Sequence, residues 1–165
     1  MKIWIGIDNG VSGTIGIVSQ EGNVLEFFKT PVVSGQDYTK AKKNISRVDH
    51  QKLRNLFEIY APAEDLTVKA LVERPLVNPT RFLATTSALR ALEATLIVLE
   101  QIGIPYEFID SKEWQKDMLP KGIKGSAELK KASKDIGERL FPHNIINHPD
   151  TDGLLIAEYG RRKNK

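Results

Sequence analysis

Several acidic side chains stand at the borders of apolar segments in this sequence. The residues in question are Asp8, Glu73, His148, Asp150 and Asp152. Asp8 and Glu73 each end an apolar run, and the other three directly precede one. Burying a carboxylate in such a place is costly unless it is paired or binds a metal. Because the chain has no cysteine, these residues form a donor set for a hard cation such as Mg²⁺ or Mn²⁺.

Acidic ligands from three separate segments are what a two-metal phosphodiesterase requires. Two cations about 4 Å apart activate a water and stabilise the leaving oxygen, and a carboxylate bridges them. Each residue also has an ordinary explanation, because Asp8 could form an Asx turn, Asp152 could cap a helix and His148 could lie at the surface. Only their combination indicates a metal site.

The N-terminal stretch IGIDNGVSGTIGIV, residues 5–18, fits two enzyme classes. Its Asp8-Asn9-Gly10 turn is similar to the first phosphate loop of the sugar kinase, actin and Hsp70 superfamily, and to the first acidic strand of ribonuclease H-type nucleases. The ATPases close two domains on a nucleotide, whereas 165 residues accommodate one. Length therefore favours the nuclease, and no second phosphate loop occurs.

The elements that must position these residues follow from strand, turn and helix patterns. Strands are expected at residues 2–8, 14–19, 24–30, 68–73 and 105–109, and helices at 48–60, 80–102, 112–118, 126–140 and 151–161. Short glycine-containing turns make the first three strands antiparallel, and helical crossovers make the later strands parallel to the first. The predicted fold class is α/β, a ribonuclease H-like fold with a five-stranded mixed sheet and helices on both faces.

The remaining segments predict a single domain, residues 1–165, with a basic C-terminal tail at 161–165. Residues 31–46 show little periodicity, which predicts a mobile loop. The strand at residues 105–109 is expected to be buried. No apolar run reaches the roughly 20 residues of a membrane span, and the N-terminus does not resemble a signal peptide. We therefore expect a cytoplasmic protein.

Basic residues are unevenly distributed, although the net charge is only +3. Segment 40–54 holds six basic residues against one acidic residue, and segment 112–134 holds seven lysines against three acids. Such clusters fit a polyanion such as nucleic acid, although each could also be solubilising surface charge.

Taken together, the motifs resemble the RuvC-type Holliday junction resolvases, in particular phage-borne and related bacterial members. The resemblance covers nearly the whole chain and is carried by IGIDNGVSGTIGIV, ALVERP, RFLATTSALRALEATL and DGLLIAEYGRR. It implies a homodimeric crossover junction endodeoxyribonuclease that nicks two strands of a four-way DNA junction in recombination and repair, with two Mg²⁺ or Mn²⁺ ions per site. Asp8, Glu73 and Asp152 match the acidic positions of the family.

The fourth ligand departs from the family pattern. Members often carry an acid three residues before the last aspartate, and this position is Pro149 here. His148 or Asp150 must then substitute. His148 is preferred, because a spacing of four from Asp152 keeps both residues on one helical face.

The resemblance also assigns DNA contacts and a dimer interface. Phe82 lies close to the family's aromatic wedge, although it could equally be a core residue at a helix start. The expected phosphate contacts are Arg74, Asn78, Arg81, Lys40, Lys42, Lys43, Lys121, Lys124, Lys130 and Lys131. Residues 89–102 are apolar nearly all round, and in the family this helix forms the dimer interface.

Two other functions compete with the resolvase. The first is another ribonuclease H-like nuclease, acting on RNA or an RNA–DNA hybrid. The second is a non-catalytic junction-binding protein, which the clustered acids disfavour because they repel phosphates.

Overall fold

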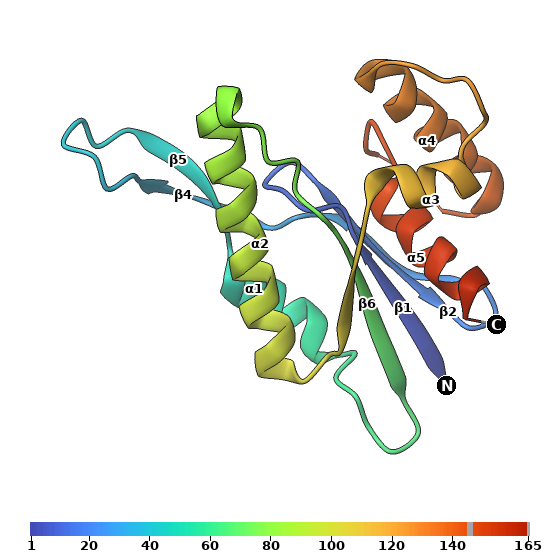
Figure 1. Ribbon diagram of the computed structural model, residues 1–165. Coiled ribbons are helices and arrows are strands. Elements are labelled where there is room, and N and C mark those ends of the chain that lie inside the picture. The colour runs from blue at the N-terminus through green and yellow to red at the C-terminus, as the bar shows by residue number, and fades with distance from the viewer. Residues whose placement is uncertain (145–146, 165) are drawn as a thin grey trace.

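A five-stranded mixed sheet forms the centre of the computed structural model, which describes residues 1–144 and 147–164 (Figure 1). Its strands lie in the order β3-β2-β1-β6-β7, and their bounds are β1 (Lys2–Ile7), β2 (Thr14–Ser19), β3 (Val24–Lys29), β6 (Thr67–Glu73) and β7 (Tyr106–Ile109). The first three strands are antiparallel, and β6 and β7 run parallel to β1. The predicted fold class, α/β and ribonuclease H-like, is confirmed.

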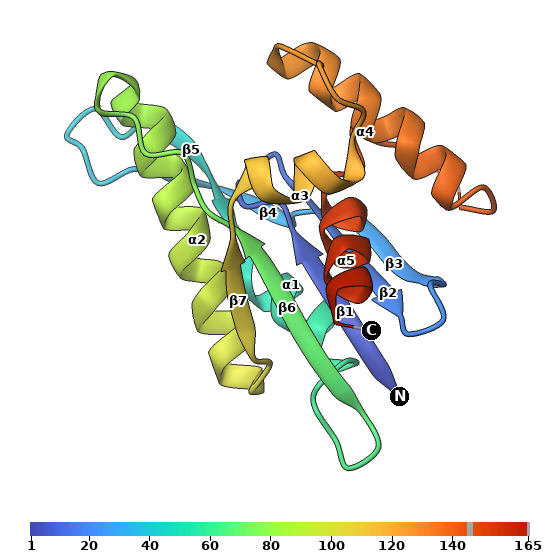
Figure 2. The same cartoon turned by 45° about the vertical axis from the view of Figure 1, so that its right-hand side comes forward.

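Helices cover both faces of this sheet (Figure 2). Within the described residues they are α1 (His50–Glu58), α2 (Phe82–Ile102), α3 (Ser111–Met118), α4 (Ser126–Leu140) and α5 (Asp152–Lys163), with a 3₁₀ turn η1 (Pro79–Arg81) before α2. Helices α1 and α2 pack on one face, and α3 and α5 on the other, where α4 contacts α5. The Asp49 side chain caps α1, and Gly103 ends α2 in the left-handed conformation at a φ of 79°.

Side chains along β1 point alternately to the two faces of the sheet, so the core has two halves. Ile3, Ile5 and Ile7 point into the half formed with α1 and α2, whereas Trp4 points into the half formed with α3 and α5. Both halves are buried, which explains why β1 and β2 read as almost continuous apolar runs.

Residues 31–46 do not form the expected mobile loop. They lie mainly in a second, two-stranded sheet, an antiparallel hairpin of β4 (Val32–Gln36) and β5 (Asn44–Val48) that projects from the domain (Figure 1). Most of its side chains are exposed, so no apolar alternation marked the strands. The expectation of a buried strand at 105–109 was also wrong, because β7 is an edge strand with exposed Glu107 and Phe108.

Helix α2 corrects the expectation about long apolar segments. By length and composition alone, residues Pro79–Ile102 could span a membrane, with a mean hydropathy of 1.5. In the fold, Val98 and Leu99 bury one side of the helix in the core. The other side leaves Leu89 and Ile97 almost half exposed, and it also carries the charged residue Glu93.

The basic run at 161–165 is largely the last turn of α5 rather than a tail. Arg161 and Arg162 each lie 2.7 Å from a carboxylate oxygen of Glu158, and Lys163 lies 3.0 Å from Asp117. Lys165 lies outside the described residues.

Candidate metal centre

The first two carboxylates are placed by adjacent parallel strands. Ile7 of β1 pairs with Val72 of β6, so the next residues along the two strands, Asp8 and Glu73, emerge side by side at the carboxyl edge of the sheet. The Asp8 amide donates to the Thr14 carbonyl at 3.0 Å, which fixes the backbone where β1 turns back into β2.

Glycines bring the first turn of α5 down to the same edge. A Cβ on Gly6 would lie 2.1 Å from the Gly153 carbonyl oxygen, and a Cβ on Gly153 would lie 2.5 Å from the Thr14 carbonyl oxygen. A side chain at either position would force helix and sheet apart. The backbone of α5 therefore rests directly on β1 and β2, which sets Asp152 beside Asp8.

Thr14 connects the sheet to the acidic residues of the helix start. Its hydroxyl accepts a hydrogen bond from the Gly153 amide at 3.0 Å and donates to Asp150 Oδ1 at 3.4 Å. Asp150 is completely buried. Thr14 was not identified from the sequence, where nothing distinguishes it from an ordinary strand threonine.

Three carboxylates converge at this edge. Ligand oxygens of Asp8, Asp150 and Asp152 all lie within 4.8 Å of one another. Glu73 faces them from β6, and its charge acts on Asp8. Oxygen donors alone, with no sulfur, are the set that Mg²⁺ or Mn²⁺ prefers, so these residues could hold such a cation.

Burial and mutual repulsion make the carboxylates hard to ionise together. Burial, with further repulsion from Glu73 and Asp152, raises the pKa of Asp8 well above its ordinary value. Burial likewise raises the pKa of Glu73 to about 7 and that of Asp152 to about 6. A bound divalent cation would relieve this repulsion, which is the physical reason to expect one here.

A buried tryptophan orients Glu73. The Trp114 Nε1 group of α3 donates to Glu73 Oε2 at 2.6 Å, and the Trp114 side chain is completely buried. This bond occupies one carboxylate oxygen and leaves the other for a ligand. Trp114 lies 41 positions from Glu73, and the sequence pattern gave no sign of the contact.

Helix α4 supplies a cation and a support for the start of α5. Lys130 Nζ donates to Asp150 Oδ2 at 2.9 Å, so a lysine expected to contact DNA lies at the acidic cluster. The buried Ser133 accepts from the Thr151 amide at 3.0 Å, and its carbonyl accepts from the Thr151 hydroxyl at 2.6 Å.

The structure brings Asp150, not His148, to Asp8 and Asp152. Helix α5 begins only at Asp152, so His148 and Asp152 do not share a helical face and the spacing argument fails. His148 is buried against the edge of Phe27, with Nδ1 3.1 Å from the Asp150 carbonyl oxygen. The three acids that come together include Asp150, whereas His148 lies behind it with Nδ1 3.4 Å from Asp150 Oδ1 and supports the loop that carries Asp150.

Comparison with known proteins gives a structural match only. No family model matches the chain, and no curated protein matches it by sequence. The structure of T. thermophilus RuvC in complex with a Holliday junction substrate matches with a TM-score of 0.64 and 14% identity, over 100% of this chain and 98% of that one. A second Thermus thermophilus RuvC structure matches with a TM-score of 0.62 and 16% identity, over 98% and 96% of the two chains. The chain has the RuvC fold.

On this RuvC fold, the residues expected to contact DNA near Glu73 lie between β6 and α2. Arg74 Nη1 lies 3.1 Å from Asp110, and its guanidinium lies 5.6 Å from the centre of the Phe108 ring. Asn78 caps η1 by accepting from the Thr80 amide. Phe82 is 66% exposed, so its alternative assignment as a core residue is excluded.

The other expected DNA contacts lie on two projections of the RuvC fold. The exposed residues Lys40, Lys42 and Lys43 are at the tip of the β4–β5 hairpin, and Arg81 is exposed in η1. Lys121 and Lys124 lie between α3 and α4, and Lys131 lies on α4; all three are exposed. The carboxyl edge of the sheet lies between these projections (Figure 2).

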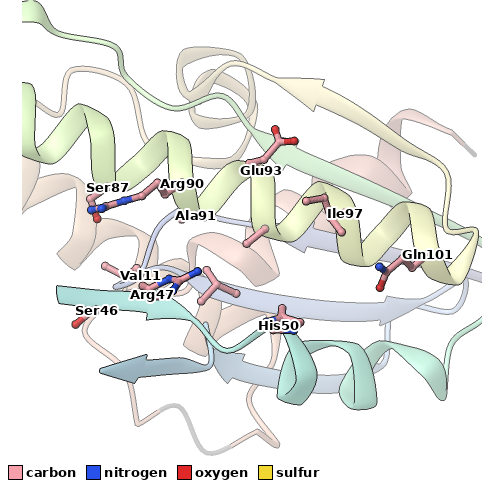
Figure 3. A pocket seen from close by; sticks show the side chains of 12 residues that line it. Val11, Ser46, Arg47, His50, Ser87, Arg90, Ala91, Glu93, Ile97 and Gln101 are labelled. Carbon is pink, nitrogen blue, oxygen red and sulfur yellow. The ribbon is translucent and has the colours of Figure 1, made fainter. Parts of the chain in front are cut away.

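A groove on this RuvC fold lies away from the acidic cluster. It encloses about 460 Å³ between α2 and the β5–α1 segment (Figure 3), and its lining includes Val11, Arg47, Arg90 and Ile97. None of the four acidic side chains lines it. It lies along the partly exposed side of α2, separate from the candidate metal centre.

Proposed function

We propose that this chain is a metal-dependent endonuclease that resolves four-way and other branched DNA junctions by paired nicks. The observation that carries the proposal is the convergence of Asp8, Asp150 and Asp152 at the carboxyl edge of a RuvC fold, with Glu73 facing them. A structural neighbour with the same fold is a RuvC bound to a Holliday junction substrate.

In this proposal each acidic residue has a distinct place. Asp8 experiences the charges of Glu73, Asp150 and Asp152, so it would hold the cations together with them. Two Mg²⁺ or Mn²⁺ ions per site, when bound, would activate a water and stabilise the leaving 3′ oxygen. Trp114 holds the Glu73 carboxylate in place, and Lys130 offsets charge at Asp150.

The surroundings of the cluster favour a nucleic acid with a distorted backbone. Phe82 is exposed beyond Glu73, and Leu76 and Leu83 beside it in sequence are 80% and 82% exposed. Exposed apolar side chains next to a phosphate-cleaving edge are suited to wedge between bases. A four-way junction offers such bases at the exchange point, where pairing is already strained.

We further propose that two copies associate through the exposed side of α2. Leu89 is 44% exposed and Ile97 is 45% exposed, and they lie eight residues apart on one helical stripe. A two-fold contact there would cover both side chains together with Glu93, which lies between them on the same stripe. Two identical sites would then account for two nicks in a two-fold junction.

Two competing functions make different predictions for one assay. An RNA or RNA–DNA hybrid nuclease would cut the hybrid in preference to the junction, and a non-catalytic binding protein would cut nothing. We expect the purified protein to cut a synthetic four-way junction, and neither linear duplex nor hybrid at a comparable rate, only when Mg²⁺ or Mn²⁺ is present. We place this activity in the cytoplasm, or in the host cytoplasm if the protein is phage-encoded.

A further inference from the structure

The β4–β5 hairpin is an arm that the core of the domain does not require. Its strands pair over five positions, from Val32 opposite Val48 to Gln36 opposite Asn44, and form a sheet of their own. Its base is anchored, because Val48 is buried in the core and the Asp49 amide donates to the Pro31 carbonyl at 2.9 Å, and β5 also contacts α2. Five-residue strands extend the tip by about 17 Å.

The loop at the tip of this arm is held by internal hydrogen bonds. Asp37 Oδ1 accepts from the Thr39 amide at 3.1 Å, the Thr39 hydroxyl at 2.7 Å and the Lys43 amide at 3.2 Å. The Lys42 amide also donates to the Thr39 carbonyl at 3.0 Å. The carboxylate of Asp37 is therefore engaged within the loop.

This loop displays an aromatic ring among lysines. Tyr38 is 89% exposed, more than any other large apolar side chain in the described residues. Lys40, Lys42 and Lys43 are exposed on the same loop, and Arg47 is exposed on β5. Three lysines on the same loop as an exposed ring are complementary to a polyanion that offers flat faces for stacking.

The arm also lies where it could reach the substrate. Figures 1 and 2 show the hairpin and the start of α2 at the end of the molecule to which the carboxyl ends of β1 and β6 point. The tip is therefore on the same side as the acidic cluster and Phe82. A two-stranded ribbon of this kind fits the major groove of DNA, which is about 12 Å wide.

We propose that the β4–β5 hairpin is a second DNA-reading element, in which the lysines hold the phosphates of a junction arm and Tyr38 stacks on a base exposed at the exchange point. This inference rests on the proposed function, since it needs a branched nucleic acid. It assigns Tyr38 a role that Phe82 does not fill, because the two rings sit on separate elements, the hairpin and the start of α2.

The test compares variants of the full chain for binding to a fluorescently labelled four-way junction without divalent metal, over a series of salt concentrations. Tyr38→Ala should weaken binding about tenfold with an unchanged salt slope, because stacking is not electrostatic, and Tyr38→Phe should bind like wild type. Lys42→Ala should reduce the log–log salt slope by about 0.9. Ile59→Ala, which removes a 71% exposed apolar side chain on a different element, should change neither.

The outcomes separate this inference from the proposed function. If wild type cuts the junction but Tyr38→Ala binds it equally well, the hairpin inference is overturned and the nuclease proposal stands. If Tyr38→Ala instead turns a dimer into a monomer in light scattering, the arm contacts a second copy of the chain and not DNA. If wild type neither binds nor cuts any junction, both fail.

Discussion

At the scale of single residues, the acidic cluster combines four carboxylates with one nearby lysine. Asp8→Asn, Glu73→Gln, Asp150→Asn and Asp152→Asn should each reduce cleavage by at least a hundredfold and leave junction binding intact or stronger. Under the proposed function, each would remove a metal ligand and a negative charge close to a phosphate. Single-turnover cleavage and binding in the same buffer measure both effects. Near wild-type cutting by any one variant removes that residue from the site.

The raised carboxylate pKa values predict how the metal-free protein responds to pH. Burial raises the pKa of Glu73 to about 7 and that of Asp152 to about 6, above the ordinary value of about 4. The folded state therefore holds extra protons in this range, so stability should fall as the pH rises from about 4.5 to 7.5. Mg²⁺ should restore it. Thermal melts with chelator and with Mg²⁺ across this range test the sign, and a rising melting temperature in chelator would contradict it.

Lys130 should act as the counter-ion that a cation replaces. Lys130→Met removes the ammonium 2.9 Å from Asp150, which should lower the melting temperature in chelator and enlarge the gain on adding Mg²⁺. Lys131→Met, at the next and exposed position, is the matched control and should change neither. An unchanged response to Mg²⁺ in Lys130→Met would assign this lysine to DNA alone, as the sequence predicted.

Sequence patterns located the carboxylates but not their support. Asp8 and Glu73 each end an apolar run. The cost of burying a carboxylate there can be recognised from the sequence alone. Trp114 and Thr14 form hydrogen bonds with residues far along the chain. Each could also be an ordinary buried residue of a helix or strand, so the sequence did not single it out. His148 was preferred over Asp150 for its four-residue spacing from Asp152, but this spacing aligns two side chains only within one helix, and both the predicted helix at 151–161 and the observed α5 begin after His148.

At the scale of elements, the contact between α5 and the sheet determines whether the site exists. Gly153→Ala would place a methyl group 2.5 Å from the Thr14 carbonyl oxygen, so the helix must move away and carry Asp152 with it. We expect a loss of stability of about 1–3 kcal/mol or more and a larger loss of activity. Gly35→Ala adds the same methyl group where the nearest atom, Arg47 Cδ, is 3.7 Å away, an ordinary contact, so it is the matched control and should change stability little.

The hairpin shows why some strands were not predicted from the sequence pattern. Strands are recognised by a buried face, and β4 and β5 have almost none, so their residues resemble a linker. By contrast, β1, β2 and β6 lie between two cores and were predicted to within one or two residues of their ends. Helix α1 was located by its apolar spacing, and the structure shows that Asp49 caps it.

At the scale of the whole molecule, the proposed dimer depends on one side of α2. Ile97→Glu places a charge on a side chain that is 45% exposed and should yield folded monomers with reduced paired nicking. Ile59→Glu adds the same charge at the residue that follows α1, outside the stripe, and should remain dimeric. Light scattering and circular dichroism together distinguish dissociation from unfolding. A wild-type monomer at micromolar concentration would remove this interface from the proposal.

The most direct measurement is cleavage of a synthetic four-way junction with each strand labelled in turn. The proposal predicts that wild type with Mg²⁺ nicks two opposing strands at symmetric positions, and leaves linear duplex and RNA–DNA hybrid of matching sequence largely intact. Asp152→Asn should bind the same junction and leave it uncut. Faster cutting of the hybrid than of the junction, or equal cutting by Asp152→Asn, would contradict the assignment of this acidic edge as a junction-resolving metal centre.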